Sequence, residues 1–272
     1  MRLRWSTPQH EARPYSRLAE IYDHVMRHVD YQLWAEHVDL LLRRAGVRRG
    51  PLLDLACGTG SLSWHLRRLG WQPTLCDLSG HMVRQAAGKF RQRGVRAPMW
   101  VADMRQLAVR RCFPAVVCIY DSMNYLLSAE EWAGALRRVA DGLQGDGAFV
   151  FDVCTVLNSR RNFRNFRDRE SGPGFTYTRK SSYLEAKDLQ INEFEIELAR
   201  EPGVVFKELH QQRIYRLAEV EAMVEASPLR IEGKYCDFTV KPGTEQCERV
   251  HYVLRHREES GELIGQRVGD RG

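Results

Sequence analysis

Two short segments carry residues whose types and spacing suit nucleoside binding. Residues 52–60 form an apolar strand that leads into the glycine turn Cys57-Gly58-Thr59-Gly60, and Asp77 ends the next apolar run. In a parallel sheet these strand ends lie side by side, so the turn and the carboxylate face one crevice. Glycines let backbone approach a ligand closely, and a carboxylate about twenty residues further on can bind ribose hydroxyls. The pattern predicts a nucleoside site.

Carboxylates end four successive predicted strands, at Asp54, Asp77, Asp103 and Asp121. This acidity disfavours a diphosphate but tolerates a sulfonium group with an amino-acid tail. The dinucleotide pattern G-x-G-x-x-G also lacks its third glycine, because Ser63 stands there. We therefore expect a sulfonium nucleoside, and a nicotinamide cofactor remains the alternative.

The elements that position these residues alternate along the first half of the chain. Alternating strands and helices predict an α/β fold, a doubly wound Rossmann-like sheet of seven strands. The first five strands are expected at residues 52–55, 72–76, 99–102, 115–120 and 148–154, with helical spacing between them.

The flanking segments differ from this pattern. Residues 10–45 are expected to be helical and to cap the sheet, because apolar residues recur there every three or four positions. After the fifth strand, β-forming stretches at 175–183, 189–198 and 204–215 predict an antiparallel β insertion. The expected division is N-terminal helices and the main cofactor-binding part at 1–155, an acceptor lid at 156–214, the end of the Rossmann-like domain at 215–256, and a disordered tail at 257–272.

Composition gives few further constraints. No apolar run is long enough for a membrane-spanning helix, and the first residues lack the apolar centre of a signal peptide. The seven cysteines show no metal-type spacing, so no metal is expected. Five of them lie in or beside apolar runs and are predicted to be small buried side chains in a reducing cytoplasm: Cys57, Cys76, Cys112, Cys118 and Cys154.

The segments described above resemble a known family. Residues 53–60 resemble motif I of class I S-adenosylmethionine-dependent methyltransferases, and Asp103-Met104 resembles their adenine-contacting motif. Asp77-Leu78-Ser79-x-x-Met82 resembles the ribose-binding loop, and residues 120–126 resemble motif IV. Tyr22-Asp23-x-x-Met26, with Tyr31 and Trp34, and the stretch 208–215 are similar to the "methyltransferase domain 25", YqeM-like type.

The resemblance implies S-adenosylmethionine as the cofactor and a set of contact residues. The implied cofactor contacts are Tyr22, Trp34, Asp54, Ala56, Cys57, Gly58, Gly60, Asp77, Leu78, Met82, Ala102, Asp103, Met104, Tyr120, Asp121 and Asn124. The substrate-binding candidates are Tyr15, Asn124, Tyr125, His210 and Arg213. A base is needed only for an alcohol, phenol or protonated amine, and the candidates for it are Tyr22, Tyr120 and His210.

We expect methyl transfer by in-line displacement to nitrogen or oxygen of a small molecule, by a cytoplasmic monomer or homodimer. The net charge of +6 and the interleaved Arg and Phe of residues 160–167 motivate an RNA or protein acceptor as the alternative. A nicotinamide-dependent oxidoreductase is a third possibility, and a non-catalytic cofactor-binding protein a fourth.

Overall fold

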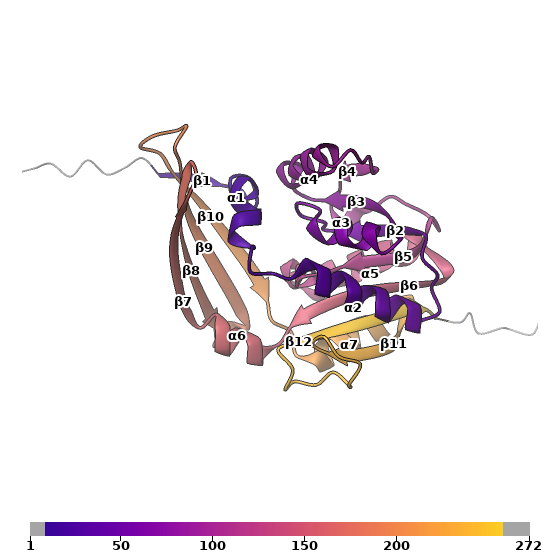
Figure 1. Cartoon of the computed structure of the whole chain (residues 1–272). Coiled ribbons are helices and arrows are strands. Elements are labelled where there is room, and N and C mark those ends of the chain that lie inside the picture. The colour runs from indigo at the N-terminus through magenta and orange to yellow at the C-terminus, as the bar shows by residue number, and fades with distance from the viewer. Residues whose placement is uncertain (1–8, 258–272) are drawn as a thin grey trace, which may run out of the picture.

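The computed structural model describes residues 9–257, which form a larger and a smaller β-sheet, and the smaller sheet lies to one side of the α/β part (Figure 1). The strands are β1 (Gln9–Ala12), β2 (Pro51–Leu55), β3 (Gln72–Asp77), β4 (Met99–Val101), β5 (Phe113–Cys118), β6 (Leu143–Cys154), β7 (Asn165–Gly172), β8 (Phe175–Leu184), β9 (Leu189–Leu198), β10 (Val205–Arg213), β11 (Leu229–Cys236) and β12 (Arg249–His256). The α-helices are α1 (Leu18–Val25), α2 (Tyr31–Arg44), α3 (Ser61–Arg68), α4 (Gly80–Gln92), α5 (Ala129–Gly142), α6 (Val156–Asn162) and α7 (Leu217–Glu225).

The larger sheet has seven strands in the order β11-β12-β6-β5-β2-β3-β4. β12 runs antiparallel to β6 and to β11, and the remaining neighbours are parallel. One face packs under α5 and α7 and the other under α2 and α3, so the central strands are apolar on both sides. The predicted α/β fold with a seven-stranded Rossmann-like sheet is confirmed.

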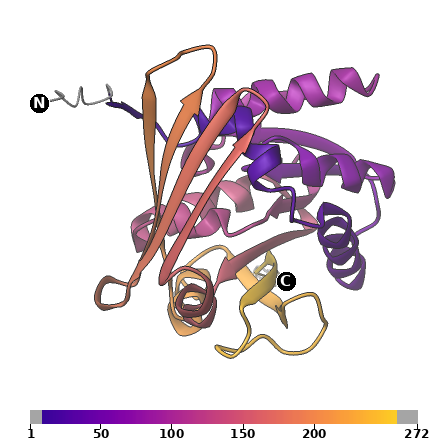
Figure 2. The same ribbon diagram turned by 60° about the vertical axis from the view of Figure 1, so that its left-hand side comes forward.

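The smaller sheet has the order β1-β10-β9-β8-β7. Strands β7 to β10 form an antiparallel meander, and β1 adds in parallel at the edge of β10. Figure 2 shows this meander lying across the α/β part. In β9 and β10 alternate residues are buried, which gives the sheet an inner face that looks toward the larger sheet.

The N-terminal segment differs from the expected run of helix at 10–45. Its first residues form β1, and helices occupy only α1 and α2. Tyr15, between β1 and α1, has a φ of 59°, a left-handed conformation that no helix interior allows. Helix α2 begins at the N-cap Asp30, whose carboxylate accepts from the N–H groups of Gln32 and Leu33.

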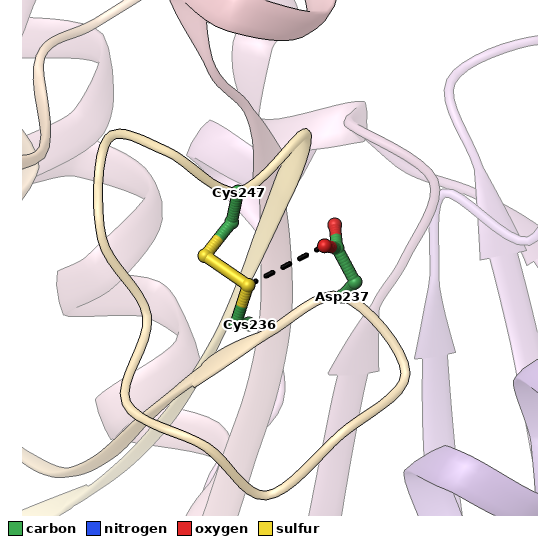
Figure 3. Close-up of side chains that lie close together, drawn as sticks. All are labelled: Cys236, Asp237 and Cys247. Atoms are coloured by element: carbon green, nitrogen blue, oxygen red, sulfur yellow. Dashed lines mark hydrogen bonds between the residues drawn. A yellow bond between two sulfur atoms is a disulfide. The ribbon is translucent and has the colours of Figure 1, made fainter.

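The cysteines differ in two ways from the expected buried set. Cys112 is exposed, because it lies in the connection that precedes β5. Cys236 and Cys247 form a disulfide, and the Asp237 side chain lies beside it (Figure 3). The pairing was not anticipated, because a fold must bring β11 and the segment before β12 together first.

Within residues 9–257 no helix combines the length and the apolarity needed to span a bilayer. The disordered tail was predicted at 257–272; Arg257 is described and donates to the carbonyls of Ser227 and Glu225, and residues 258–272 lie outside the described residues.

Candidate active site

A cavity of about 740 Å³ lies between the carboxyl ends of β2 to β5 and the inner face of the smaller sheet. The N-terminal segment around Tyr15 and Tyr22 forms part of its wall. Such a volume is in the range that holds a nucleoside cofactor together with a small second molecule. Strand ends, the N-terminal segment and the smaller sheet therefore enclose one continuous site.

The glycine turn and Asp77 form one hydrogen-bonded unit at the floor of the cavity. The Asp77 carboxylate accepts from the N–H of Gly58 at 2.9 Å and from that of Ser79 at 2.8 Å. Each oxygen keeps a further lone pair that can accept a hydroxyl hydrogen. Gly58 has a φ of 55°, and a Cβ added there would lie 4.0 Å from the Tyr22 ring. The added Cβ would be in ordinary van der Waals contact, so it is the left-handed φ that favours glycine at this position.

Asp54 lies buried at the end of β2 and accepts the Ser63 hydroxyl at 2.5 Å. Burial raises the pKa of its carboxyl to about 7; the Ser63 bond acts against this, and nearby Asp77 adds to it. Burial also raises the pKa of Asp77, against the two backbone hydrogen bonds. A cation bound in this part of the cavity would favour the ionised form of both groups.

The wall beyond Asp77 combines an apolar surface with a charged loop. Leu78 is 65% exposed although it is a large apolar residue, so its side chain is available to cover a flat ring. Asp103 is paired with Arg105 at 2.6 Å, and this hydrogen-bonded pairing holds the pKa of Asp103 below its usual value. Met82, Ala102 and Met104 complete this part of the lining.

Strained backbone concentrates at the cavity. Tyr15, Ala56, Tyr120 and Asp121 all have φ between 52° and 67° and all line the cavity. Non-glycine residues adopt this region at a cost, and they do so mainly where surrounding structure holds them. At the end of β5 that support is Asp152, whose carboxylate accepts from the N–H groups of Tyr120 and Asp121.

Asp121 belongs to a buried ion cluster with Arg249 and Asp152. Arg249 lies 2.8 Å from Asp121, also pairs with Asp152, and has its guanidinium 5.1 Å from the ring centres of Trp34 and Tyr120. Burial raises the pKa of Asp152, and the charge and hydrogen bond of Arg249 act against this. The aromatic rings hold the arginine in place.

A chain of hydrogen bonds runs from the cavity into the smaller sheet. The hydroxyl oxygens of Tyr15 and Tyr125 lie 2.5 Å apart, and that of Tyr125 lies 3.1 Å from Nδ1 of His210. Nε2 of His210 lies 3.2 Å from the Glu208 carboxylate, which also accepts from the backbone N–H groups of residues 15, 17 and 18. We call Tyr15, Tyr125, His210 and Glu208 the relay.

Electrostatics set the direction of the relay. Burial acts to raise the pKa of Glu208, but the His210 hydrogen bond and the backbone donors outweigh it, so the pKa lies below its usual value. In the neutral form of His210, a proton on Nε2 faces the ionised Glu208, and Nδ1 is then free to accept from Tyr125. Burial raises the pKa of Tyr15 and Tyr125, so both phenols are neutral donors. The Tyr15 oxygen then keeps its lone pairs for another donor.

Three residues expected to contact ligands do not line this cavity. Gly60 is packed against helix α4, where an added Cβ would lie 3.2 Å from Ala86. Asn124 is buried, donates to the Arg213 carbonyl and accepts from the Cys154 N–H, so its amide joins three segments. Arg213 instead points to Glu219 at 3.1 Å. The other candidates all line the cavity: Tyr15, Tyr22, Trp34, Asp54, Ala56, Cys57, Gly58, Asp77, Leu78, Met82, Ala102, Asp103, Met104, Tyr120, Asp121, Tyr125 and His210.

The inner face of the smaller sheet contributes residues that the sequence analysis did not select. Gln190 and Gln212 are buried there and bonded to each other at 2.9 Å, and Asn192 lies beside His210 in the strand register. The sequence did carry a signal for Gln190 and Asn192. They fall on the same face of β9 as the apolar residues Phe194 and Ile196, where a purely structural face would be apolar throughout. Tyr31, Thr59 and Ser79, which lie in the quoted motifs but were not predicted as contacts, also line the cavity, and so do Arg179 and Arg249.

Comparison with known proteins bears on this site. Residues 52–147 match the methyltransferase domain family. The Bacillus subtilis (strain 168) protein YqeM is 27% identical over 245 residues, which cover 88% of this chain and 95% of YqeM. A crystal structure of an S-adenosylmethionine-dependent methyltransferase from Clostridium acetobutylicum ATCC 824 matches with a TM-score of 0.75 at 25% identity, over 89% of this chain and 98% of that one. The chain is a class I S-adenosylmethionine-dependent methyltransferase.

Another relative of this methyltransferase has a named acceptor. The dTDP-3-amino-3,4,6-trideoxy-alpha-D-glucopyranose N,N-dimethyltransferase of Streptomyces venezuelae is 28% identical over 219 residues, covering 79% of this chain and 90% of that protein. The methyltransferase carries groups that fit S-adenosylmethionine: the Asp77 carboxylate can accept hydrogen bonds from hydroxyls, the exposed Leu78 can cover a ring, and the buried Asp54 carboxylate can pair with a cation. The nicotinamide alternative is therefore set aside.

Proposed function

We propose that this methyltransferase transfers methyl groups to the amino group of a small hydroxylated molecule, such as an amino sugar. The relay carries this proposal, because it ends at the cavity in a phenol oxygen that can accept a proton from an amine. The enclosed cavity suits a small acceptor. The Streptomyces venezuelae relative, named as an amino-sugar N,N-dimethyltransferase, supports the same class.

S-adenosylmethionine, when bound, supplies a methyl group whose bond to the positively charged sulfur breaks as the acceptor nitrogen bonds to the carbon. The chain supplies alignment, exclusion of water and a proton path. As Tyr15 accepts a proton from the acceptor's ammonium group, it passes its own hydroxyl proton to Tyr125, and Tyr125 passes its own proton to Nδ1 of His210, so both phenols end neutral. Glu208 then stabilises the imidazolium that forms.

The remaining roles follow from position. Asp77 would bind the ribose and Asp54 the ammonium of the amino-acid tail, while Leu78, Asp103 and Met104 would surround the adenine. Tyr22 would cover the glycine turn, and Tyr120, with Trp34 and Asp121, would line the path of the methyl group. The smaller sheet would hold the acceptor. A cytoplasmic location and a monomeric or dimeric state stay predictions.

The test uses the purified protein, S-adenosylmethionine with a labelled methyl group, and matched pairs of acceptors. Each pair consists of an amino sugar, free or nucleotide-linked, and the analogue with hydroxyl in place of the amine. We expect label on the amine of at least one pair and none on its hydroxyl partner. Transfer to hydroxyl analogues alone, or to RNA or protein added in the same assay, would overturn the proposal.

A further inference from the structure

Arg179 lies on the inner face of β8 and lines the acceptor side of the cavity. Its guanidinium is 5.3 Å from the ring centres of Phe163 and Phe166 and 5.7 Å from that of Phe194. An arginine held among aromatic rings is presented in a fixed orientation, because the rings restrict its rotamers and attract its charge.

Two polar neighbours fix part of the guanidinium. Its Nε donates to the Ser181 hydroxyl at 3.2 Å and its Nη2 to the Asn192 side-chain oxygen at 3.0 Å. Both partners are neutral. Nη1 makes no hydrogen bond to any residue between 9 and 257, so part of the donor fork is available to a ligand.

Arg179 also lacks a carboxylate partner within the described chain, where no acidic oxygen lies within 4.0 Å of it. Arg249 and Arg105, which line the same cavity, are each paired with carboxylates. Arg13 has no such partner either, but it is exposed to solvent. Asp168, directly across from Arg179 in the strand register, accepts from the Tyr177 hydroxyl instead.

A partly buried cation without a counterion is costly, and cation–π contacts offset only part of that cost. We propose that Arg179 binds an anionic oxygen group, phosphate or carboxylate, that the acceptor carries in addition to its amine. The inference rests on the proposed function, since it concerns the acceptor of the same site. Arginine suits such a group because the N–H groups of its planar guanidinium can donate two parallel hydrogen bonds.

The strand register limits where that anion lies. Arg179 bonds to Asn192 on β9, and Asn192 pairs with His210 on β10. Two strand spacings, about 10 Å in all, separate β8 from β10, so Arg179 and His210 extend from one face of the sheet into the same cavity. Burial raises the pKa of Tyr125, and the charge of Arg179 acts against this, so the two groups interact across the cavity.

The same arrangement accounts for the interleaved Arg and Phe of residues 160–167. Phe163 and Phe166 hold Arg179, as described above. Arg160 and Arg161 are exposed and pair with Glu185 and Glu248. Within this stretch the phenylalanines therefore contact Arg179 of the acceptor site, and these two arginines form ion pairs at the surface.

The experiment measures anion binding without any methyl transfer. Wild-type protein loaded with S-adenosylhomocysteine is titrated calorimetrically with inorganic pyrophosphate and, separately, with succinate. We expect saturable binding of at least one anion, weakened about tenfold or more in Arg179→Gln. Preference for pyrophosphate indicates a phosphorylated acceptor, and preference for succinate indicates a carboxylate.

Lys180→Gln is the matched control, because Lys180 is exposed on the opposite face of β8. It should bind the anion as wild type does, and S-adenosylhomocysteine affinity should be unchanged in both variants, which shows that they fold. Equal anion binding in wild type and Arg179→Gln, or no saturable binding of either anion to wild type, overturns the inference. Failure of amine methylation, with anion binding intact, would instead refute the proposed function.

Discussion

The hydroxyl oxygens of Tyr15 and Tyr125 lie 2.5 Å apart, although 110 positions separate the two residues in the sequence. Tyr15 comes from the segment between β1 and α1, and Tyr125 from the turn after β5. The contact therefore forms only when the N-terminal segment is docked over the strand ends. The segment that carries Tyr15 thus both lines the cavity and supplies the outer oxygen of the relay.

Replacing Tyr15 by phenylalanine removes the relay's terminal oxygen and leaves the ring. We expect kcat for amine methylation to fall about a hundredfold, the lower range for loss of a general base, with little change in affinity for S-adenosylhomocysteine. Tyr183→Phe is the control, because its hydroxyl bonds to Asp188 outside the cavity. An unchanged kcat in Tyr15→Phe would show that the relay carries no proton.

The pKa of about 7 at Asp54 predicts pH-dependent cofactor binding. Below that pH the free protein holds a proton on Asp54, whereas an ammonium group bound beside it requires the ionised carboxylate. Affinity for S-adenosylhomocysteine should therefore rise as the pH increases through 7, by up to about tenfold per unit on the acid side. Calorimetry at pH 6, 7 and 8 measures this.

Asp54→Asn provides the comparison, since asparagine keeps the shape and cannot ionise. Its affinity should be lower at pH 8 and should lose the rise seen in wild type. If the wild-type affinity is flat across this range, the ammonium group is not bound at Asp54.

The sequence made the cofactor half of the site predictable because its signals are local. The glycine turn and Asp77 occupy consecutive strand ends. A parallel sheet brings such ends together independently of how the rest of the chain folds. The bond from the Gly58 N–H to Asp77 is the direct result. The same reasoning gave the order of strands and helices through β6.

The cavity wall that the smaller sheet forms was less predictable because its contacts are long-range. Alternation in β9 and β10 shows which residues share a face, but not that this face encloses a cavity with Arg179 in it. The cluster of Asp121, Asp152 and Arg249 joins three strands and has no local pattern. Asn124 was selected for its place after a strand, but its amide satisfies backbone groups.

Two buried histidines predict loss of stability in mild acid. Burial lowers the pKa of His37 to about 4 and that of His251 well below its usual value. The unfolded chain takes up these protons below about pH 6.5, so their contribution to stability is full above that pH and falls as the pH decreases toward 4. In that pH range each histidine lowers the free energy of unfolding by about 1.4 kcal/mol per pH unit.

His37→Phe isolates the effect, because all other titrating groups are common to both proteins. Between pH 7 and pH 5 the variant should lose about 2 kcal/mol less unfolding free energy than wild type, measured by urea denaturation. His10→Phe makes the same change at an exposed position and should follow wild type. If wild type, His37→Phe and His10→Phe all lose the same unfolding free energy between pH 7 and pH 5, then His37 takes up its proton in the folded state as well.

The disulfide between Cys236 and Cys247 predicts a redox-dependent stability. It joins two residues that are 11 positions apart, and the loop between them carries Phe238, whose ring centre lies 4.9 Å from that of Trp34 at the cavity. A cross-link of this length limits the unfolded chain and stabilises the fold by about 2–3 kcal/mol. Reduction with dithiothreitol, or Cys247→Ser, should lower the free energy of unfolding by that amount.

Thiol titration in denaturant identifies the pairing behind this effect. The protein should show five reactive thiols before reduction and seven after it. Cys112→Ser removes an exposed free thiol and should leave stability unchanged. Seven thiols in the unreduced protein would mean that the two sulfurs do not bond, and Phe238 would then be held against Trp34 by packing alone.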